Sequence, residues 1–245
     1  MTHHKSSLKL LSPLVLAEEV KLHYEERRRE LVNYLKALGA IRSGNVERAF
    51  LTVPREEFVP PELRDEAYVD TPLPLFDTGQ TISAPHMVAY MVEMLELTGC
   101  LKVLEVGGGS GYAACVVAEV INPTGAEVRC PKVYTIEIDP FLVRFARENI
   151  RRTGYEERVE VIEGDGTLGL PEMSPFDRIM VSAAAANVPP ALLEQLAEGG
   201  KMLIPIGRHI WGQKLYSIKK AEGEIKKEFL MEVAFVPLRC HGEPF

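Results

Sequence analysis

A glycine-rich segment with the sequence GGGSG is the first candidate for chemistry in this chain of 245 residues. It follows an apolar run, residues 101–106, that predicts a buried strand, and precedes a helical pattern over residues 111–121. Glycines at such a turn let a ligand approach the backbone, and the helix N-terminus offers free N–H groups to a carboxylate. A tight turn without a ligand is the alternative. We predict a ligand site formed by Gly107, Gly108, Gly109, Ser110 and Gly111.

Two acidic residues follow the next two predicted strands. Glu137 lies at the end of strand 133–138, and Asp165 follows strand 159–162 and precedes Gly166. The carboxyl ends of parallel strands meet at one edge of a sheet, so both acids are expected near the glycines. Glu137 can accept both ribose hydroxyls, and Asp165 can accept an adenine amino group. Taken singly, each could instead be a helix cap or a surface charge.

These features discriminate between nucleotide cofactors. The dinucleotide fingerprint G-x-G-x-x-G is broken by Tyr112, and Glu137 lies 28 residues after Gly109 (137 minus 109) instead of about 20. A site for adenosine and an amino-acid carboxylate, without phosphate, fits S-adenosylmethionine, which we predict as the cofactor. A nicotinamide dehydrogenase is the alternative, but the sequence offers no candidate hydride-transfer site.

A second motif, GQTISAPHM over residues 79–87, precedes the first predicted strand. Ser83 followed by Pro85 predicts a helix start with Ser83 as the N-cap. Capping does not require the preceding Gln-Thr-Ile or His86. The motif therefore carries a second, chemical role, although His86 alone could equally be a packing residue.

Alternating strands and helices must position these motifs. The apolar periodicity predicts strands over residues 101–106, 133–138, 159–162, 176–182 and 201–206, and helices over residues 84–97, 111–121, 140–152 and 190–197. Residues 214–220 and 226–236 are predicted to form an antiparallel pair around Glu222-Gly223. The result is an α/β fold with a doubly wound, mostly parallel, Rossmann-like sheet and antiparallel C-terminal strands.

The first third of the chain predicts a helical and irregular cap. Helices are expected over residues 14–38 and 46–51, followed by a proline-rich, ordered stretch to residue 74. The three arginines at positions 27–29 are flanked by acids and predict a solvated helix face. We place the cap at residues 1–82 and the cofactor-binding domain at residues 83–245.

Composition limits the partners. The formal net charge of −7 argues against nucleic acid. Four scattered cysteines show no zinc or redox spacing, and Cys100 and Cys115 are expected to be small core residues in a reduced setting. No apolar run approaches the length of a membrane span, and residues 1–11 lack the pattern of a signal peptide. We expect a cytoplasmic monomer without a metal or a membrane partner.

Four segments resemble the protein L-isoaspartyl O-methyltransferase family, and the resemblance covers residues 45–239. They are GQTISAPHM over residues 79–87, VPREEFVP over 53–60, FDRIMV over 176–181 with the alanines that follow Ser182, and FVPL over 235–238. The first is highly specific, whereas the glycine segment is common to most methyltransferases of this fold. Ser182 departs from the threonine expected there, and Phe76-Asp77-Thr78 is a further small departure.

The resemblance implies methylation of the carboxylate of L-isoaspartyl residues in damaged proteins, which starts repair through a succinimide; acceptance of D-aspartyl residues is left open. Ser83 is implied as the active-site hydroxyl. The implied cofactor-binding residues are Gln80, Thr81, Ile82, Ser83, Gly107, Gly109, Glu137, Asp165 and Gly166. A substrate surface is expected on residues 60–77 and 181–188, with contacts from His86, Val181 and Ala183. A methyltransferase for a small acid or another polymer, and a non-catalytic cofactor-binding protein, are the alternatives.

Overall fold

A seven-stranded sheet forms the centre of the computed structural model, which describes residues 13–127, 129–208, 212–240 and 243–244. Its strand order is β5-β4-β3-β6-β7-β8-β9. The strands are β3 (Val103–Val106), β4 (Val133–Glu137), β5 (Val159–Glu163), β6 (Phe176–Val181), β7 (Leu196–Ile206), β8 (Gln213–Ala221) and β9 (Glu224–Val233). The first five in this order pair in parallel, and β8 and β9 are antiparallel. The predicted fold class is confirmed, and the strand order changes direction between β3 and β6, where such folds bind ligands.

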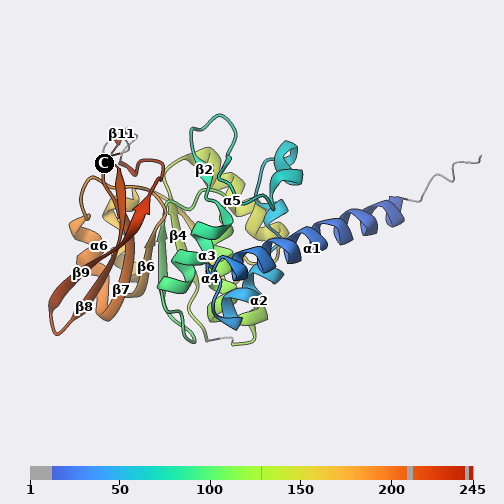
Figure 1. Cartoon of the computed structure of the whole chain (residues 1–245). Helices are drawn as coiled ribbons and strands as arrows, with labels where there is room; N and C mark the ends of the chain where they lie inside the picture. The colour runs from blue at the N-terminus through green and yellow to red at the C-terminus, as the bar shows by residue number, and fades with distance from the viewer. Residues whose placement is uncertain (1–12, 128, 209–211, 241–242, 245) are drawn as a thin grey trace, which may run out of the picture.

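Helices cover both faces of the sheet (Figure 1). One face packs against α3 (Pro85–Met94), α4 (Tyr112–Ile121) and α5 (Pro140–Arg152), and the other against α6 (Pro190–Gln195). Successive strand residues point to opposite faces, so Val103 joins the first core and Leu104 the second. Because side chains alternate between the two faces, one short strand contributes to both apolar layers.

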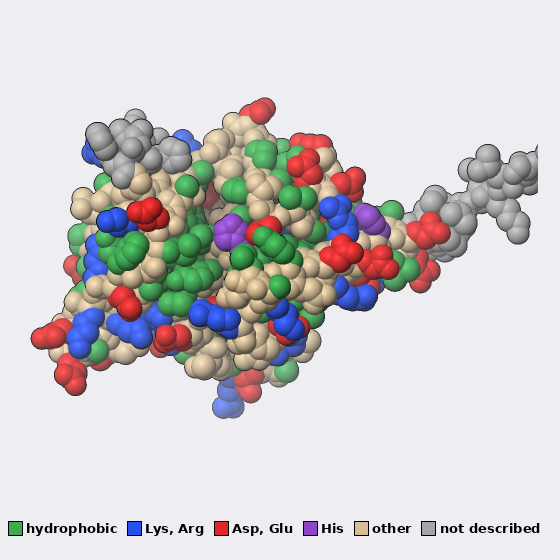
Figure 2. All heavy atoms as spheres, in the orientation of Figure 1, with side chains coloured by type: hydrophobic (Ala, Val, Ile, Leu, Met, Phe, Trp, Pro, Cys, Tyr) green, Lys and Arg blue, Asp and Glu red, His purple; other side chains and the backbone are tan. Residues whose placement is uncertain are grey.

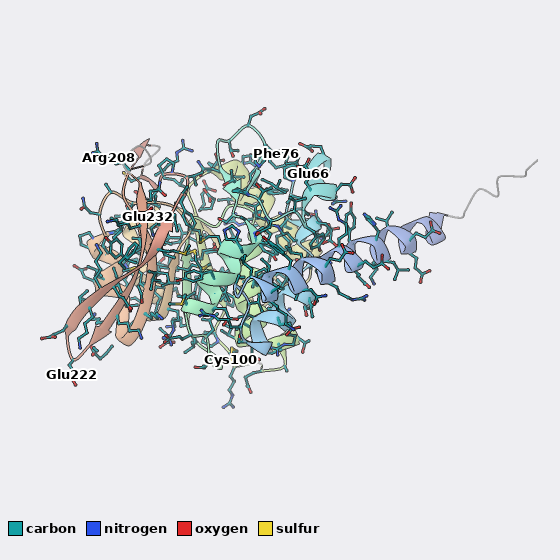
Figure 3. The ribbon with its side chains drawn as sticks, in the orientation of Figure 1. Glu66, Phe76, Cys100, Arg208, Glu222 and Glu232 are labelled. Atoms are coloured by element: carbon teal, nitrogen blue, oxygen red, sulfur yellow. A yellow bond between two sulfur atoms is a disulfide. The ribbon has the colours of Figure 1, made fainter. Side chains whose placement is uncertain are left out.

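The remaining elements surround this sheet. They are α1 (Pro13–Ala37), α2 (Gly44–Thr52), η1 (Arg55–Glu57), η2 (Pro61–Glu66), β1 (Leu73–Pro74), β2 (Thr81–Ile82), η3 (Pro123–Gly125), η4 (Gly166–Leu168), η5 (Pro171–Met173), β10 (Arg239–Cys240) and β11 (Glu243–Pro244). The N-terminal part of α1 extends away from the body, at the opposite end from the β8–β9 hairpin, whose tip carries Glu222 (Figures 1 and 3). No helix in the described ranges is long and apolar enough to cross a membrane. The prediction for residues 1–11 lies outside the described residues, and the boundary at residues 82/83 stays a prediction.

The prediction of a solvated arginine face on α1 is wrong for Arg28. Its side chain is 12% exposed and donates to Glu56 at 2.9 Å and to the Tyr68 hydroxyl at 2.8 Å. Both partners lie after α2, where no sequence pattern could place them against α1. Arg28 therefore connects α1 to the irregular segment that precedes the sheet.

The predicted role of Cys100 is also wrong. Cys100 is exposed and forms a disulfide with Cys130, with the two Cα atoms 4.9 Å apart, at the edge of the molecule seen in Figure 3. The two cysteines are 30 positions apart in the sequence, with β3 and α4 between them, so only the βαβ geometry brings the two thiols together. Cys115, in contrast, is a buried free thiol, as predicted.

Candidate active site

Three neighbouring cavities follow the carboxyl edge of β3, β4 and β6. The first, of about 470 Å³, is lined by Pro72, Thr81, Ser83, Ala84, His86, Met87, Ser182 and residues 231–236. The second is lined by Thr81, Ile82, Ser83, Val88, Met91, Glu105, residues 107–110, Tyr112, Ala113, Met180 and Ser182. The third is lined by Gln80, Val106, Gly107, residues 136–138, Gly166, Ala183 and residues 237–239. Ser83 belongs to the first and second cavities and Gly107 to the second and third, so the three form a row.

Ser83 lies at the wall between the first two cavities. Its predicted role as an N-cap is wrong, because α3 has Ala84 as its N-cap and uses no side-chain cap, while Pro85 occupies the first turn as predicted. The residue is half-buried, and within the described ranges no hydrogen bond involves its hydroxyl. The hydroxyl therefore keeps its hydrogen-bonding capacity for a ligand.

Residues 107–110 of the glycine segment line the second cavity, and Gly107 also lines the third; ligand binding by the segment stays a prediction. Gly109 adopts φ +53°, and its N–H donates to Glu137 at 2.8 Å. A Cβ on Gly108 would lie 2.4 Å from Thr135 Oγ1, so a side chain there would displace the Thr135 side chain. Glycine at position 108 therefore allows the segment to pack closely against β4.

Glu137 links the end of β4 to the glycine segment through hydrogen bonds. One carboxylate oxygen accepts from Gly109, and the other accepts from the N–H groups of Ile138 and Asp139 at 2.9 Å each. Burial raises the pKa of Glu137, and the three N–H groups oppose that shift. The side chain also lines the third cavity, next to Gly166.

Asp165 is the N-cap of η4 and accepts from Thr167 N at 2.9 Å and Thr167 Oγ1 at 2.6 Å. The cap proposed as the alternative for this acid is therefore present. Gly166 beside it faces the third cavity, and a Cβ there would lie 2.4 Å from Val106. Contact of Asp165 with an adenine stays a prediction.

The predicted substrate contacts separate into different places. His86 lines the first cavity, and its Nδ1 lies 2.9 Å from Asp70 Oδ1. Ala183 lines the third cavity, whereas Val181 is a fully buried core residue at the end of β6. Ser182, between them in sequence, reaches the first and second cavities instead.

Two parts of this site were not predicted from the sequence. Residues 231–236 form one wall of the first cavity; Glu232, on β9, is labelled in Figure 3. Glu105 lies in the second cavity, 1% exposed, where Thr135 Oγ1 donates to it at 2.7 Å and Ser182 Oγ at 3.1 Å. Burial raises the pKa of Glu105 to about 7. A single acid inside the apolar strand VLEV was the signal available in the sequence.

The raised pKa of Glu105 has a consequence for stability. The folded protein keeps a proton that the unfolded chain loses above about pH 4.3, so the free energy of unfolding falls as the pH rises from there to about 7. We expect Glu105→Gln to remove this dependence, with a gain over the parent of about 3 kcal/mol at pH 8 and almost none near pH 4. Urea unfolding of both proteins at pH 4, 6 and 8 measures it, and a gain that does not grow with pH would contradict the assignment.

The row of cavities suits a long ligand with different ends. The second cavity offers a buried carboxyl group and main-chain N–H groups, and the third offers a carboxylate and small residues. Among the described residues no group of three or more His, Cys, Asp or Glu side chains could hold a metal ion.

Comparisons with known proteins agree on one family. The sequence profile of the family "Protein-L-isoaspartate(D-aspartate) O-methyltransferase (PCMT)" matches residues 26–242. A Methanopyrus kandleri protein-L-isoaspartate O-methyltransferase is 53% identical over 225 residues, 91% of this chain and 95% of its own length. The Hyperthermus butylicus protein of the same name is 52% identical over 216 residues, 88% of this chain and 89% of its own.

Two solved structures carry the same family name. A structure named protein-L-isoaspartate O-methyltransferase has a TM-score of 0.77 at 31% identity, over 88% of this chain and 67% of its own. A Plasmodium falciparum protein described as the same enzyme, in complex with S-adenosyl-L-homocysteine, has a TM-score of 0.77 at 33% identity, over 86% of this chain and 98% of its own.

Proposed function

Since the chain belongs to the protein-L-isoaspartate(D-aspartate) O-methyltransferase family, we propose that Ser83 is the centre at which it methylates isoaspartyl residues. The enzyme transfers a methyl group from S-adenosylmethionine to the free carboxylate of these residues in damaged proteins. The observation that carries the role of Ser83 is its position in the wall common to the first and second cavities.

In the proposed arrangement the second and third cavities hold the cofactor. Its methionine end lies in the second cavity, where Glu105 faces the α-ammonium group and the N–H groups at the start of α4 face the carboxylate. Its adenosine end lies in the third cavity, where Glu137 and Gly166 meet the ribose and adenine. Gln80, Thr81 and Ile82 close the two cavities from the β2 side.

The chemistry requires little from the protein beyond orientation. The bound cofactor supplies a methyl group activated by a positively charged sulfur. An isoaspartyl carboxylate is ionised at neutral pH, so no general base is needed. Ser83 donates one neutral hydrogen bond and directs a carboxylate oxygen toward the methyl group. A bidentate arginine would stabilise a ground-state charge that the reaction removes.

The first cavity is proposed to receive the damaged peptide. Its walls combine Ser83 and His86 with residues 231–236, which are apolar except for Glu232. Apolar side chains gather over the centre of the face shown in Figure 2, where the surface is hollowed beside the β8–β9 hairpin. An extended chain fits this shape, with its free carboxylate directed inward. Action as a monomer, without nucleic acid, is part of the proposal, and the net charge of −7 supports the second point.

A pair of peptides tests the function. Two peptides of the same sequence, one with an aspartyl and one with an isoaspartyl linkage, are incubated with the protein and methyl-labelled S-adenosylmethionine. We expect base-labile label on the isoaspartyl peptide alone. Label on neither peptide, or equal label on both, would reject isoaspartyl methylation.

A further inference from the structure

Arg55 is a buried arginine that bonds to the main chain of Ser83, the proposed catalytic residue. It lies in η1, and its side chain is 0% exposed. Nη2 donates to the main-chain carbonyl of Ser83 at 2.9 Å, and Nε donates to the carbonyl of Ala67 at 2.8 Å. The side chain thus joins the proposed catalytic residue to the end of η2.

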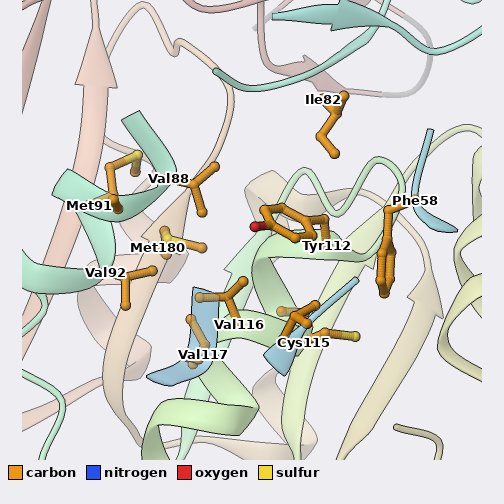
Figure 4. Close-up of a cluster of buried hydrophobic side chains, with 14 of the residues drawn as sticks. Phe58, Ile82, Val88, Met91, Val92, Tyr112, Cys115, Val116, Val117 and Met180 are labelled. Atoms are coloured by element: carbon orange, nitrogen blue, oxygen red, sulfur yellow. The ribbon is translucent and has the colours of Figure 1, made fainter. Parts of the chain in front are cut away.

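The same guanidinium also supports a second wall of the site. Its Cζ lies 4.9 Å from the centroid of the Tyr112 ring, and Tyr112 lines the second cavity. Figure 4 shows Tyr112 between Phe58 on one side and Val88 and Met180 on the other, with its hydroxyl toward the latter pair. Burial raises the pKa of Tyr112 to about 12, so the ring is neutral and presents a π face to the cation.

Burying Arg55 in this way costs folding free energy that a residue with only a packing role would not need to cost. Within the described ranges no carboxylate forms an ion pair with Arg55, and its Nη1 is buried without a hydrogen-bond partner. Burial also lowers the pKa of Arg55, because it removes the charged guanidinium from water. A buried donor without a partner costs about 1–3 kcal/mol, which an apolar side chain of similar size would avoid. Such local costs are found where function requires them.

We propose that Arg55 is a positioning residue for methyl transfer. The guanidinium lies over the Tyr112 ring and donates to the Ser83 carbonyl, so it sets the orientation of the Ser83–Ala84 peptide and with it the direction of the Ser83 hydroxyl. A small misplacement of such a group is enough to slow a reaction strongly. Lysine keeps the charge but not the fork that reaches two carbonyls while stacking on a ring. The inference rests on the proposed role of Ser83.

A double-mutant cycle tests it. We expect Arg55→Lys to lower kcat for an isoaspartyl peptide at least tenfold, while the Kd for S-adenosylhomocysteine, measured by calorimetry, stays within about threefold. In a Ser83→Ala background the same substitution should lower kcat less than twofold, because Arg55 acts through the hydroxyl that is already absent. Arg55→Met, if it folds, should resemble Arg55→Lys in kcat.

Arg28→Lys is the matched control, since Arg28 is largely buried in the same N-terminal region and does not contact Ser83. We expect it to lower the Tm and leave kcat within twofold. Unchanged kcat in Arg55→Lys, an equal loss in both backgrounds, or an equal loss in Arg28→Lys would overturn the proposal. Unchanged kcat in Ser83→Ala alone would reject the role of Ser83, and the inference about Arg55 with it.

Discussion

Replacing Ser83 with alanine is expected to lower kcat for an isoaspartyl peptide about 100-fold and to leave the Kd for S-adenosylhomocysteine within about threefold. A misplacement of about 1 Å in a reacting group can slow a reaction about 100-fold, whereas the strength of the bond to the carboxylate contributes to substrate binding because methyl transfer removes the charge. The hydroxyl has no partner among the described residues and faces the cavity proposed for the peptide as well as that proposed for the cofactor. Its loss therefore affects the orientation of the acceptor and not the structure of the site.

Ser43→Ala provides the control for this experiment. The Ser43 hydroxyl accepts from Val46 N as the N-cap of α2 and donates to Glu93 at 3.0 Å, and Ser43 lines none of the three cavities. Its removal is expected to cost about 1 kcal/mol of stability without changing kcat. Equal kcat in Ser83→Ala and the parent enzyme, or a loss explained entirely by weaker cofactor binding, would contradict the proposed role of Ser83.

Replacing Glu137 with glutamine is expected to weaken S-adenosylhomocysteine binding at least 100-fold. Both carboxylate oxygens accept from main-chain N–H groups, and one of these groups belongs to Gly109. Glutamine must turn an NH₂ toward one of these donors, which disturbs the glycine segment, and it also loses the charge proposed to hold the ribose. Calorimetric titration of the spent cofactor measures the change.

Glu163→Gln is the matched control for Glu137→Gln. Glu163 pairs with Glu137 in the β4–β5 register, also at the end of its strand, but it is exposed. We expect its substitution to leave the Kd within twofold. If both variants bound S-adenosylhomocysteine equally weakly, the effect would be a general one of charge. If Glu137→Gln bound it normally, Glu137 would not belong to the cofactor site.

The sequence was sufficient for the architecture because the elements carry regular patterns. The apolar runs 133–138 and 176–182 and the helical periodicity of 140–152 correspond closely to β4, β6 and α5. The glycine segment also lies where predicted, since a strand-to-helix turn at the carboxyl edge follows from the alternation alone. The hairpin turn at Glu222-Gly223 was found for the same local reason.

Features that depend on tertiary contacts could not be predicted in this way. Ser83 has the residue type of an N-cap, but the chain begins α3 one residue later and leaves the hydroxyl to the cavities. The disulfide of Cys100 depends on a distance set by the sheet. The strand β7 begins at Leu196 and not at residue 201, because Leu196 pairs with Phe176 across a register shift that no periodicity reveals.

The most direct measurement is a crystal structure of the enzyme with S-adenosylhomocysteine and an isoaspartyl peptide. We expect the cofactor's adenosine beside Glu137, its sulfur in the cavity shared with Ser83, and the Ser83 hydroxyl bonded to the peptide carboxylate. A cofactor bound outside these cavities, or a Ser83 hydroxyl directed away from the carboxylate, would contradict this arrangement.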